Sequence, residues 1–402
     1  MSRKFNNNHR HGRNFSRFSG GNFRAKKSKF FNPTELINKH RSNNLGISIG
    51  NEAKQENTHQ SFNDFKISDQ LKNNILQRGF QKPTPIQDKA ISSVLEGRDL
   101  IGIANTGTGK TAAFLIPLID KVVKDKKQRV LIVAPTRELA SQIKDEFFSL
   151  SRGLGIYYAL CIGGANIARQ RNDLRRNSNF VIGTPGRIQD LIRSGDLNLS
   201  NFKHVVIDEA DLMVDIGFVK DIKYIISLLP KERQSLFFSA TIDGKVKEIL
   251  NSFVRNPVTV SVKIGETTEN IEQKTIRIID RNKKINQLHD LLIQEEFEKV
   301  LVFGRTKYGV QQLSDELVKR GFKADAIHGN KKQNQRIMIL GKFKRSEIKV
   351  LLATDVASRG LDIPNVSHVI NYDLPESHDT YIHRIGRTGR LDKKGIALTF
   401  IG

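Results

Sequence analysis

Short apolar runs alternate with amphipathic segments along the chain from about residue 62 onward. In the first half, apolar runs at 130–134, 157–162 and 180–183 are separated by amphipathic segments at 137–150 and 167–175. Strands that alternate with helix-period segments are typical of βαβ units, whose strands form a parallel sheet. The pattern therefore predicts an α/β fold.

The alternation pauses between residues 261 and 271, where Lys263-Ile-Gly-Glu-Thr-Thr-Glu-Asn270 has no apolar period. It resumes in later segments at 299–303, 310–320, 324–328, 349–354 and 368–372. We therefore predict two tandem domains, at 61–262 and 271–402, joined by a linker at 263–270. Each domain is expected to hold a mainly parallel sheet flanked by helices.

The first 60 residues differ from the rest, because they carry 12 Lys/Arg and 3 Glu, a net charge of +9. Phe15, Phe18 and Phe23 are spaced among arginines and glycines, and no helix or strand period is visible. This composition predicts a disordered, basic, low-complexity tail at 1–60. Two roles stay open for it: a solubilising tail, or an RNA tether in which arginines meet phosphates and aromatic rings stack on unpaired bases.

Composition narrows the class of protein. The chain has 66 Lys+Arg against 42 Asp+Glu, a formal net charge of +24, which favours a polyanionic partner. Cys161 is the only cysteine, which excludes an intrachain disulfide and a cysteine-based zinc site. No apolar stretch approaches the roughly 20 residues of a membrane helix. We therefore expect a cytoplasmic, monomeric protein that binds no membrane, with Cys161 buried in a strand.

A glycine-rich loop, Ala104-Asn-Thr-Gly-Thr-Gly-Lys-Thr111, follows an apolar run at 99–103 and precedes a helix-period segment at 112–119. Strand, glycine loop and helix are the context in which such a loop binds nucleotide phosphates. Gly107 and Gly109 let backbone N–H groups face phosphate oxygens, Lys110 reaches the β- and γ-phosphates, and Thr111 can ligate Mg²⁺. The loop departs from the strict pattern at Ala104, where that pattern has glycine.

An acidic pair follows another apolar run, in Val205-Val-Ile-Asp-Glu-Ala-Asp211. A strand that ends at Asp208 places its carboxylate at the carboxyl edge of the sheet, where ligands of open α/β sheets bind. Asp208 is expected to hold Mg²⁺, and Glu209 to orient and deprotonate an attacking water. Together with the glycine loop, this pair indicates an ATPase.

The stretch Asp208-Glu-Ala-Asp211 spells the motif that names the DEAD-box ATP-dependent RNA helicases, and residues 62–402 resemble that family's two-domain core throughout. The further matching segments, in chain order, are Gly79-Phe-Gln-Lys-Pro-Thr-Pro-Ile-Gln87, Pro135-Thr-Arg-Glu-Leu-Ala140, Gly163-Gly164, Thr184-Pro-Gly-Arg187, Ser239-Ala-Thr241, Val302-Phe-Gly-Arg-Thr306, Gln333-x-x-Arg336, 353–362 and 383–390. The resemblance implies two tandem RecA-like domains in a bacterial-type minimal core, and ATP and Mg²⁺ as cofactors. The alanine at position 104 is normal in this family.

The resemblance also implies roles on the nucleotide side. Gln87 would read the adenine edge and Phe62 would stack on the ring, while Arg387 and Arg390 would reach the γ-phosphate as arginine fingers. The implied catalytic residues are Lys110, Asp208, Glu209, Arg387 and Arg390. The implied ATP-binding residues are Phe62, Lys82, Gln87, Ala104, Asn105, Thr106, Gly107, Thr108, Gly109, Lys110, Thr111 and Asp362. The implied Mg²⁺ ligands are Thr111 and Asp208.

On the RNA side, the implied contacts suit gripping of the sugar–phosphate backbone, which positions a strand without reading its sequence. They are Pro135, Arg137, Gly164, Thr184, Gly186, Arg187, Arg305, Gln333, Arg336 and Thr354. The residues implied to transmit the nucleotide state to RNA are Asp211, Ser239, Thr241 and His383.

Two functions use this same set of residues. The first is an ATP-dependent RNA helicase, in which RNA-stimulated ATP hydrolysis is coupled to domain closure and unwinds short duplexes or remodels RNA–protein complexes. The second is an ATP-gated RNA clamp with little strand separation. The bound partner is expected to be single-stranded RNA or a short duplex in both cases.

Overall fold

The computed structural model describes residues 58–105, 107–242, 244–262, 270–280, 283–294, 296–358, 363, 366–389 and 394–402. The predicted tail at 1–60 lies outside this part of the chain except for its last three residues. Only Asn270 of the predicted linker lies within it.

The first α/β unit is built on a seven-stranded sheet in which every described pairing is parallel. The strand order is β3-β4-β2-β5-β6-β1-β7. The strands are β1 (Leu100–Ile103), β2 (Val130–Val133), β3 (Tyr158–Cys161), β4 (Phe180–Gly183), β5 (His204–Ile207), β6 (Gln234–Ser239) and β7 (Val258–Ser261). Cys161 is fully buried in β3, as the sequence predicted, and burial raises the pKa of its thiol to about 12.

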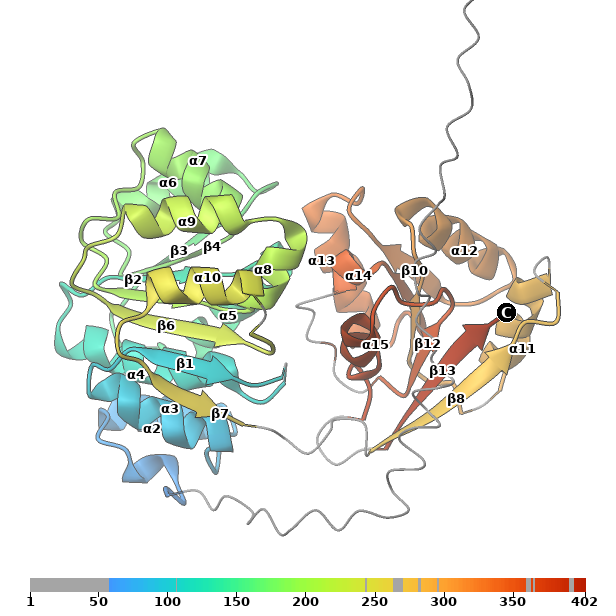
Figure 1. Ribbon diagram of the computed structural model, residues 1–402, viewed down its shortest axis with the longest axis horizontal. Coiled ribbons are helices and arrows are strands. Elements are labelled where there is room, and N and C mark those ends of the chain that lie inside the picture. Colours follow the sequence, from blue (N-terminus) through green and yellow to red (C-terminus); the bar gives the residue numbers. More distant parts are fainter. Residues whose placement is uncertain are drawn as a thin grey trace, which may run out of the picture.

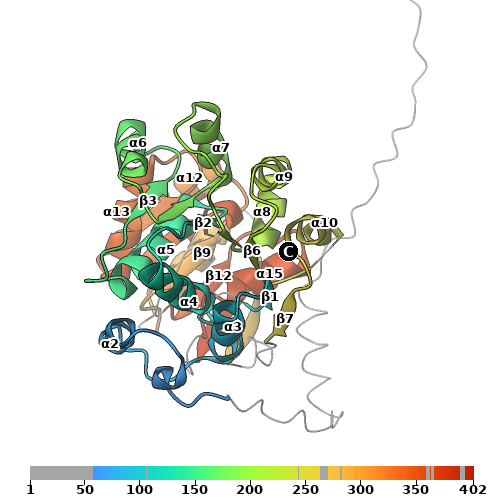
Figure 2. The ribbon, with the colours of Figure 1, turned by 90° about the vertical axis from the view of Figure 1, so that its left-hand side faces the viewer.

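Helices cover both faces of this sheet, which is why its central strands are apolar on both sides. The elements are the 3₁₀ turn η1 (Phe62–Asp64), α2 (Asp69–Gln77), α3 (Pro85–Leu95), α4 (Lys110–Lys124), α5 (Arg137–Leu150), α6 (Ile167–Arg175), α7 (Pro185–Arg193), α8 (Ala210–Ile216), α9 (Val219–Ser227) and α10 (Gly244–Phe253). Figure 2 shows α3, α4 and α5 on one side of β1, β6 and β2, and α8, α9 and α10 on the other.

The second α/β unit repeats this design with a six-stranded parallel sheet of order β10-β11-β9-β12-β13-β8. Its strands are β8 (Ile271–Arg277), β9 (Val300–Phe303), β10 (Ala324–Ile327), β11 (Val350–Ala353), β12 (His368–Asn371) and β13 (Gly395–Ile401). Its helices are α11 (Lys284–Leu292), α12 (Lys307–Lys319), α13 (Gln333–Lys344), α14 (Asp355–Ser358) and α15 (His378–Ile385). The α11 and α12 side chains pack on one face of the sheet, and those of α13 and α14 on the other.

The two units lie side by side, and α13, α14 and α15 are on the side of the second unit that faces the first (Figure 1). The arrowheads of β1 and β6 point toward the second unit (Figure 1). The carboxyl edge of the first sheet, which carries the predicted nucleotide residues, is therefore turned toward the neighbouring unit. Within the described residues, no helix combines the length and the apolar character needed to span a membrane.

Candidate functional site

Three predicted motifs meet at the carboxyl edge of the first sheet because of the strand order. The glycine loop follows β1, Asp208 follows β5, and β6 lies between these two strands. The register pairs Ile103 with Ser239, the last residue of β6, and the N–H of Ala104 donates to the Ser239 carbonyl at 3.1 Å. The sheet thus places the Ser239 segment between the glycine loop and the acidic pair.

The glycine loop turns tightly into α4 through residues in the left-handed region. Gly107 and Gly109 have φ of 86° and 90°, and a Cβ at Gly109 would overlap the side chain of Gln87. Lys110 is the first residue of α4, and its Nζ donates to the Ala104 carbonyl at 2.8 Å. The loop therefore holds its own lysine inside the space where phosphate oxygens are expected. Thr106 lies outside the described residues.

The segment predicted to read adenine contacts the glycine loop. Gln87 Oε1 accepts from the Thr84 N–H at 2.9 Å, and Gln87 Nε2 donates to the Gly109 carbonyl at 3.1 Å. The Thr84 hydroxyl donates to the Thr108 carbonyl at 2.8 Å. The Gln87 amide is thus engaged on both sides in this structure, and its contact with adenine stays a prediction. The neighbouring Lys82 is exposed.

Phe62 is 1% exposed and lies in the core of the first unit. Its ring centroid is 6.1 Å from that of Phe65 and 6.2 Å from that of Phe80. The structure therefore gives this ring a packing role, and protein atoms cover the faces that an adenine would use. Stacking on the base stays a prediction that requires the ring to be uncovered.

The acidic pair is buried, with Asp208 and Glu209 at 2% and 7% exposed. Glu209 has φ of 50° and ψ of 54°, a left-handed conformation that is uncommon for a residue with a side chain and is concentrated at functional sites. Burial raises the pKa of both carboxyls, that of Glu209 to about 7. A carboxyl with that pKa can exchange a proton near neutral pH, which is what a general base must do.

One cation from each unit acts on this carboxyl. The positive charges of Lys110 and of Arg387 both lower the pKa of Glu209, against the larger effect of its burial. Arg387 is itself 4% exposed and follows α15. The structure therefore brings one of the two predicted arginine fingers into electrostatic range of the predicted base. Arg390 and Asp362 lie outside the described residues.

Asp211 ties the acidic motif to the Ser239 segment. Its Oδ2 accepts from the N–H groups of Ala240 and Thr241, at 3.0 and 3.1 Å, and from the Thr241 hydroxyl at 3.4 Å. The Asp211 N–H donates to Ser239 Oγ at 3.2 Å, and that hydroxyl donates to the Thr241 carbonyl at 2.7 Å. A shift of either segment must therefore move the other. His383, the fourth predicted coupling residue, is half-buried on α15.

The predicted RNA-contacting residues of the first unit lie where loops leave the same edge. Arg137 begins α5, and its guanidinium passes so close to Gly164 that a Cβ there would be 2.5 Å from Nη1. Arg187 donates to Gln170 Oε1 at 3.2 Å, and Gln170 in turn donates to the Ile162 carbonyl. Arg187 is thus held by a side chain of α6, and the Arg137 guanidinium packs against the Gly164 loop. Pro135 and Thr184 are buried, whereas Gly186 is half-buried.

Gln333 and Arg336, both predicted RNA contacts of the second unit, bind an acid of the first unit. Gln333 Nε2 donates to Glu138 Oε1 at 3.0 Å, and Arg336 Nε forms an ion pair with the same oxygen at 2.9 Å. Glu138 is 5% exposed. Glu138 lies in the motif segment 135–140, but the motif predicted no role for it. An acid directly after the predicted RNA contact Arg137 was the available signal.

A second charged cluster orders the loops of the second unit. Arg384 is 2% exposed and binds both carboxylate oxygens of Asp355, at 2.5 and 2.8 Å. Asp355 directly follows Thr354, a predicted RNA contact, and Arg305, another one, donates its backbone N–H to Asp373 at 2.8 Å. Sequence reasoning missed Arg384, Asp355 and Asp373, because their pairing joins segments that are far apart in the chain.

The residues fit a nucleotide with Mg²⁺. The glycine loop offers backbone N–H groups and an ammonium, and the Thr111 hydroxyl and the Asp208 carboxylate are oxygen donors of the type that Mg²⁺ prefers. The described residues contain no cluster of three or more His, Cys, Asp or Glu that could hold a metal by itself. Mg²⁺ that binds together with substrate phosphates typically has only one or two protein ligands, because the phosphates and water supply the remaining oxygens.

Comparisons with known proteins agree with this geometry. A family model described as DEAD/DEAH box helicase matches residues 84–249, and one described as helicase conserved C-terminal domain matches residues 283–392. The DEAD-box ATP-dependent RNA helicase CshA of Geobacillus kaustophilus is 44% identical over 343 residues, which cover 85% of this chain and 73% of the relative. The CshA of Bacillus subtilis is also 44% identical over 343 residues, with 85% and 69% covered.

A solved structure of S. cerevisiae Dbp5 bound to RNA and ADP BeF3 superposes with a TM-score of 0.75 at 31% identity, covering 85% of this chain and 90% of that one. The predicted fold of two RecA-like domains, each a parallel sheet flanked by helices, is thereby confirmed. From its motifs, its fold and its relatives together, the chain belongs to the DEAD-box family of ATP-hydrolysing RNA helicases.

Proposed function

We propose that this chain couples RNA-stimulated ATP hydrolysis to closure of its two units, and that closure separates short RNA duplexes locally or displaces bound protein. The observation that carries the proposal is the meeting of residues from both units at one edge. Arg387 acts on Glu209, while Gln333 and Arg336 bind Glu138. Neither the electrostatic effect of Arg387 nor the contacts with Glu138 can occur unless the units are close together. A site that needs both is therefore active only when the units are closed.

In this mechanism Lys110 exchanges the Ala104 carbonyl for the β- and γ-phosphate oxygens of ATP. Glu209 orients the attacking water and takes its proton, for which a pKa of about 7 is well matched to neutral pH. Arg387 and Arg390 stabilise the negative charge that develops on the transferred phosphoryl group. Arginine fingers of this kind contribute on the order of 10³–10⁵ in rate.

Thr111 and Asp208 would hold Mg²⁺ when it is bound, where it would neutralise charge on the phosphate oxygens. Asp208 keeps its carboxylate aimed by accepting from the Glu209 N–H at 3.0 Å. This contact lets one acid bind the metal while its neighbour handles the proton.

The nucleotide state would reach RNA through Asp211, Ser239 and Thr241. Because Ala104 and Asp211 both bind the Ser239 segment, rearrangement of the glycine loop around ATP moves this segment, and the acidic motif with it. RNA would lie along the predicted contacts of both units, held by its sugar–phosphate backbone without sequence preference. The cytoplasmic location, the monomeric state and the boundaries at 61–262, 263–270 and 271–402 stay predictions from the sequence.

The test measures the release of a labelled strand from a short RNA duplex, and a reaction without the protein is the control. We expect release with ATP to exceed release with a non-hydrolysable ATP analogue over repeated turnovers. Tight ATP-dependent binding of RNA with no strand release in either case would favour the RNA clamp instead.

A further inference from the structure

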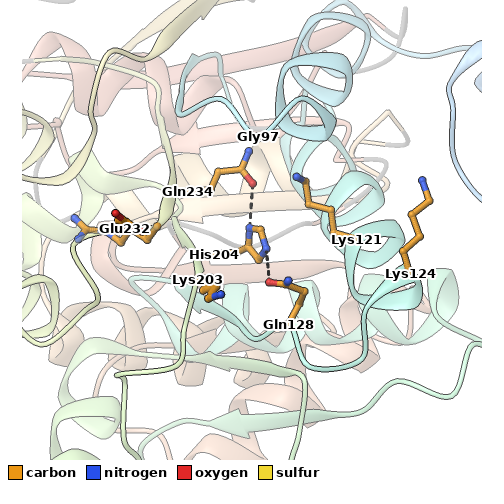
Figure 3. A pocket seen from close by; sticks show the side chains of 9 residues that line it. Gly97, Lys121, Lys124, Gln128, Lys203, His204, Glu232 and Gln234 are labelled. Atoms are coloured by element: carbon orange, nitrogen blue, oxygen red, sulfur yellow. Dashed lines mark hydrogen bonds between the residues drawn. The ribbon is translucent and has the colours of Figure 1, made fainter.

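An open hollow of about 450 Å³ lies at the amino-end edge of the first sheet, and the glycine loop and the acidic pair lie at the opposite edge. Figure 3 shows the side chains that line this hollow. It lies at the amino ends of β5 and β6 and at the last turn of α4. We call it the basal pocket and define it by its lining residues Gly97, Lys121, Lys124, Gln128, Lys203, His204, Glu232, Arg233 and Gln234. The nucleotide motifs at the other edge use none of these residues.

The lining is strongly positive, since four of its residues are Lys or Arg and one is an acid. Two of these cationic side chains already have protein partners. Lys124 forms an ion pair with Asp120 at 2.7 Å, and Arg233 donates to the carbonyls of Pro230 and Phe253. In the described part of the chain, the ammonium groups of Lys121 and Lys203 have no hydrogen-bond or ion-pair partner. The pocket therefore contains cationic groups that the protein itself does not neutralise.

His204 lies between two amide side chains in the pocket (Figure 3). Its Nδ1 is 3.0 Å from Gln234 Oε1, and its Nε2 is 3.2 Å from Gln128 Oε1. Both amides are fixed in this orientation, because Gln234 Nε2 donates to two backbone carbonyls and Gln128 Nε2 donates to Asp125. A neutral imidazole carries one N–H and can satisfy one of these oxygens, whereas an imidazolium satisfies both.

The groups around His204 disfavour its imidazolium form. Burial and the positive charges of Lys121 and Lys203 lower the pKa of His204 to about 4, although the contact with Gln234 raises it. Burial and the charge of Lys124 likewise lower the pKa of Lys121. A negative group in the pocket would remove the repulsion, pair with the two lysines and allow His204 to donate from both nitrogens.

We propose that the basal pocket binds a dianionic phosphate group. Two unpaired ammonium groups at one concave site match the charge of a terminal phosphate or a diphosphate better than the single charge of an internal phosphodiester. The volume exceeds what one phosphate needs and falls within the range of small-ligand sites.

The experiment follows the ring signals of His204 by NMR in the full chain, with the assignment made by their loss in His204→Gln. Inorganic pyrophosphate is added at constant ionic strength, against chloride as the control anion. We expect a saturable shift of the His204 signals and an upward movement of its pKa. Pyrophosphate bound at the glycine loop does not interfere, because the observed ring is at the opposite edge of the sheet.

The double variant Lys121→Gln/Lys203→Gln is expected to weaken this binding by about tenfold or more, since each lost partner is a charged hydrogen-bond donor. The matched control is Lys247→Gln, an exposed lysine on α10, which should bind pyrophosphate as the original chain does. Signals of His204 that do not move, that move equally with chloride, or that move equally in the double variant would overturn the proposal.

The source of the phosphate is distinguished by two further titrations with a short RNA, one bearing a 5′-diphosphate and one a 5′-hydroxyl. If the His204 signals shift with pyrophosphate and with the diphosphorylated RNA but not with the 5′-hydroxyl RNA, the phosphate group belongs to an RNA end. If they shift with pyrophosphate but with neither RNA, the ligand is a free anion. Equal shifts with both RNAs would instead indicate internal phosphodiesters and would contradict the dianionic assignment.

Discussion

Arg336 Nε lies 2.9 Å from Oε1 of Glu138, and this ion pair joins the second α/β unit to the first. The acid is at the start of α5, directly after Arg137, and the arginine is on α13 three residues after Gln333. Two residues of the other unit share this buried acid, so the closure proposed above would depend on a single carboxylate.

Replacing Glu138 by glutamine is therefore expected to impair closure. Loss of one partner from a buried interfacial charge pair costs ~2–5 kcal/mol, which corresponds to a fall of about 30-fold or more in RNA-stimulated turnover. The measurement is ATP hydrolysis at saturating RNA, with a fluorescence-transfer distance between the units. Asp145→Asn, on the same helix but 69% exposed, is the control and should behave as the original chain. Wild-type stimulation in Glu138→Gln would contradict this role.

Glu209→Gln tests the assignment of the base. The variant keeps the size of the side chain but cannot take a proton, so turnover should fall by about 10²–10⁴-fold. Binding of ATP and of RNA should persist, because Lys110 and the predicted RNA contacts are unchanged. Single-turnover hydrolysis and equilibrium binding separate the two effects, and hydrolysis at the original rate would exclude Glu209 as the base.

The raised pKa of Glu209 also predicts a pH dependence of stability. The folded chain binds this proton more tightly than the unfolded chain does, so the contribution is fully present below pH 4.5 and is lost as pH rises through about 7. The full loss corresponds to about 3 kcal/mol. Glu209→Gln should thus unfold at a higher temperature than the original chain at pH 8, and the difference should vanish near pH 4. Calorimetric scans across this range are the measurement, and a variant less stable than the original at pH 8 would oppose the prediction.

Gly164→Ala should weaken RNA binding through Arg137. A Cβ at this position would be 2.5 Å from Arg137 Nη1, so the guanidinium must move. Gly195→Ala is a matched control, because Gly195 has the same φ of +75° and no neighbour within 4 Å. Backbone strain of ~1 kcal/mol is then common to both variants, and the loss of RNA affinity should be confined to Gly164→Ala. Equal RNA affinity in the two variants, measured by fluorescence anisotropy, would show that this contact does not matter.

The spacing of apolar residues predicted the positions of several helices and strands correctly. The helix-period segments at 137–150 and 167–175 coincide with α5 and α6, and the apolar run at 180–183 coincides with β4. These elements are defined by local burial patterns, which a sequence displays directly. The order of the strands, with β6 between β5 and β1, is set by long-range packing and had no local signal.

The site was predictable to the extent that its residues sit in contiguous motifs. The glycine loop and the acidic pair, each a contiguous motif, lie at one edge of the sheet, and Asp211 and Thr241, both named from such motifs, are in contact. Glu138 and the Arg384–Asp355 pair were missed because a polar residue's partner is decided by tertiary structure. The ring of Phe62 shows the same limit, since an isolated aromatic looks alike in a sequence whether it stacks on a ligand or fills a core.

The Ala104 carbonyl that accepts from Lys110, and the Gly109 carbonyl that accepts from Gln87, have a thermodynamic consequence for ligand selection. Because these donors are already satisfied, nucleotide binding is an exchange of hydrogen bonds, and its free energy is a difference between two bonded states. A ligand that replaces only one of these contacts gains little. If ATP binds as proposed, with its purine edge at Gln87 and its phosphate chain at Lys110, it replaces both contacts together. Internal competition for these donors would then select complete ATP over its fragments.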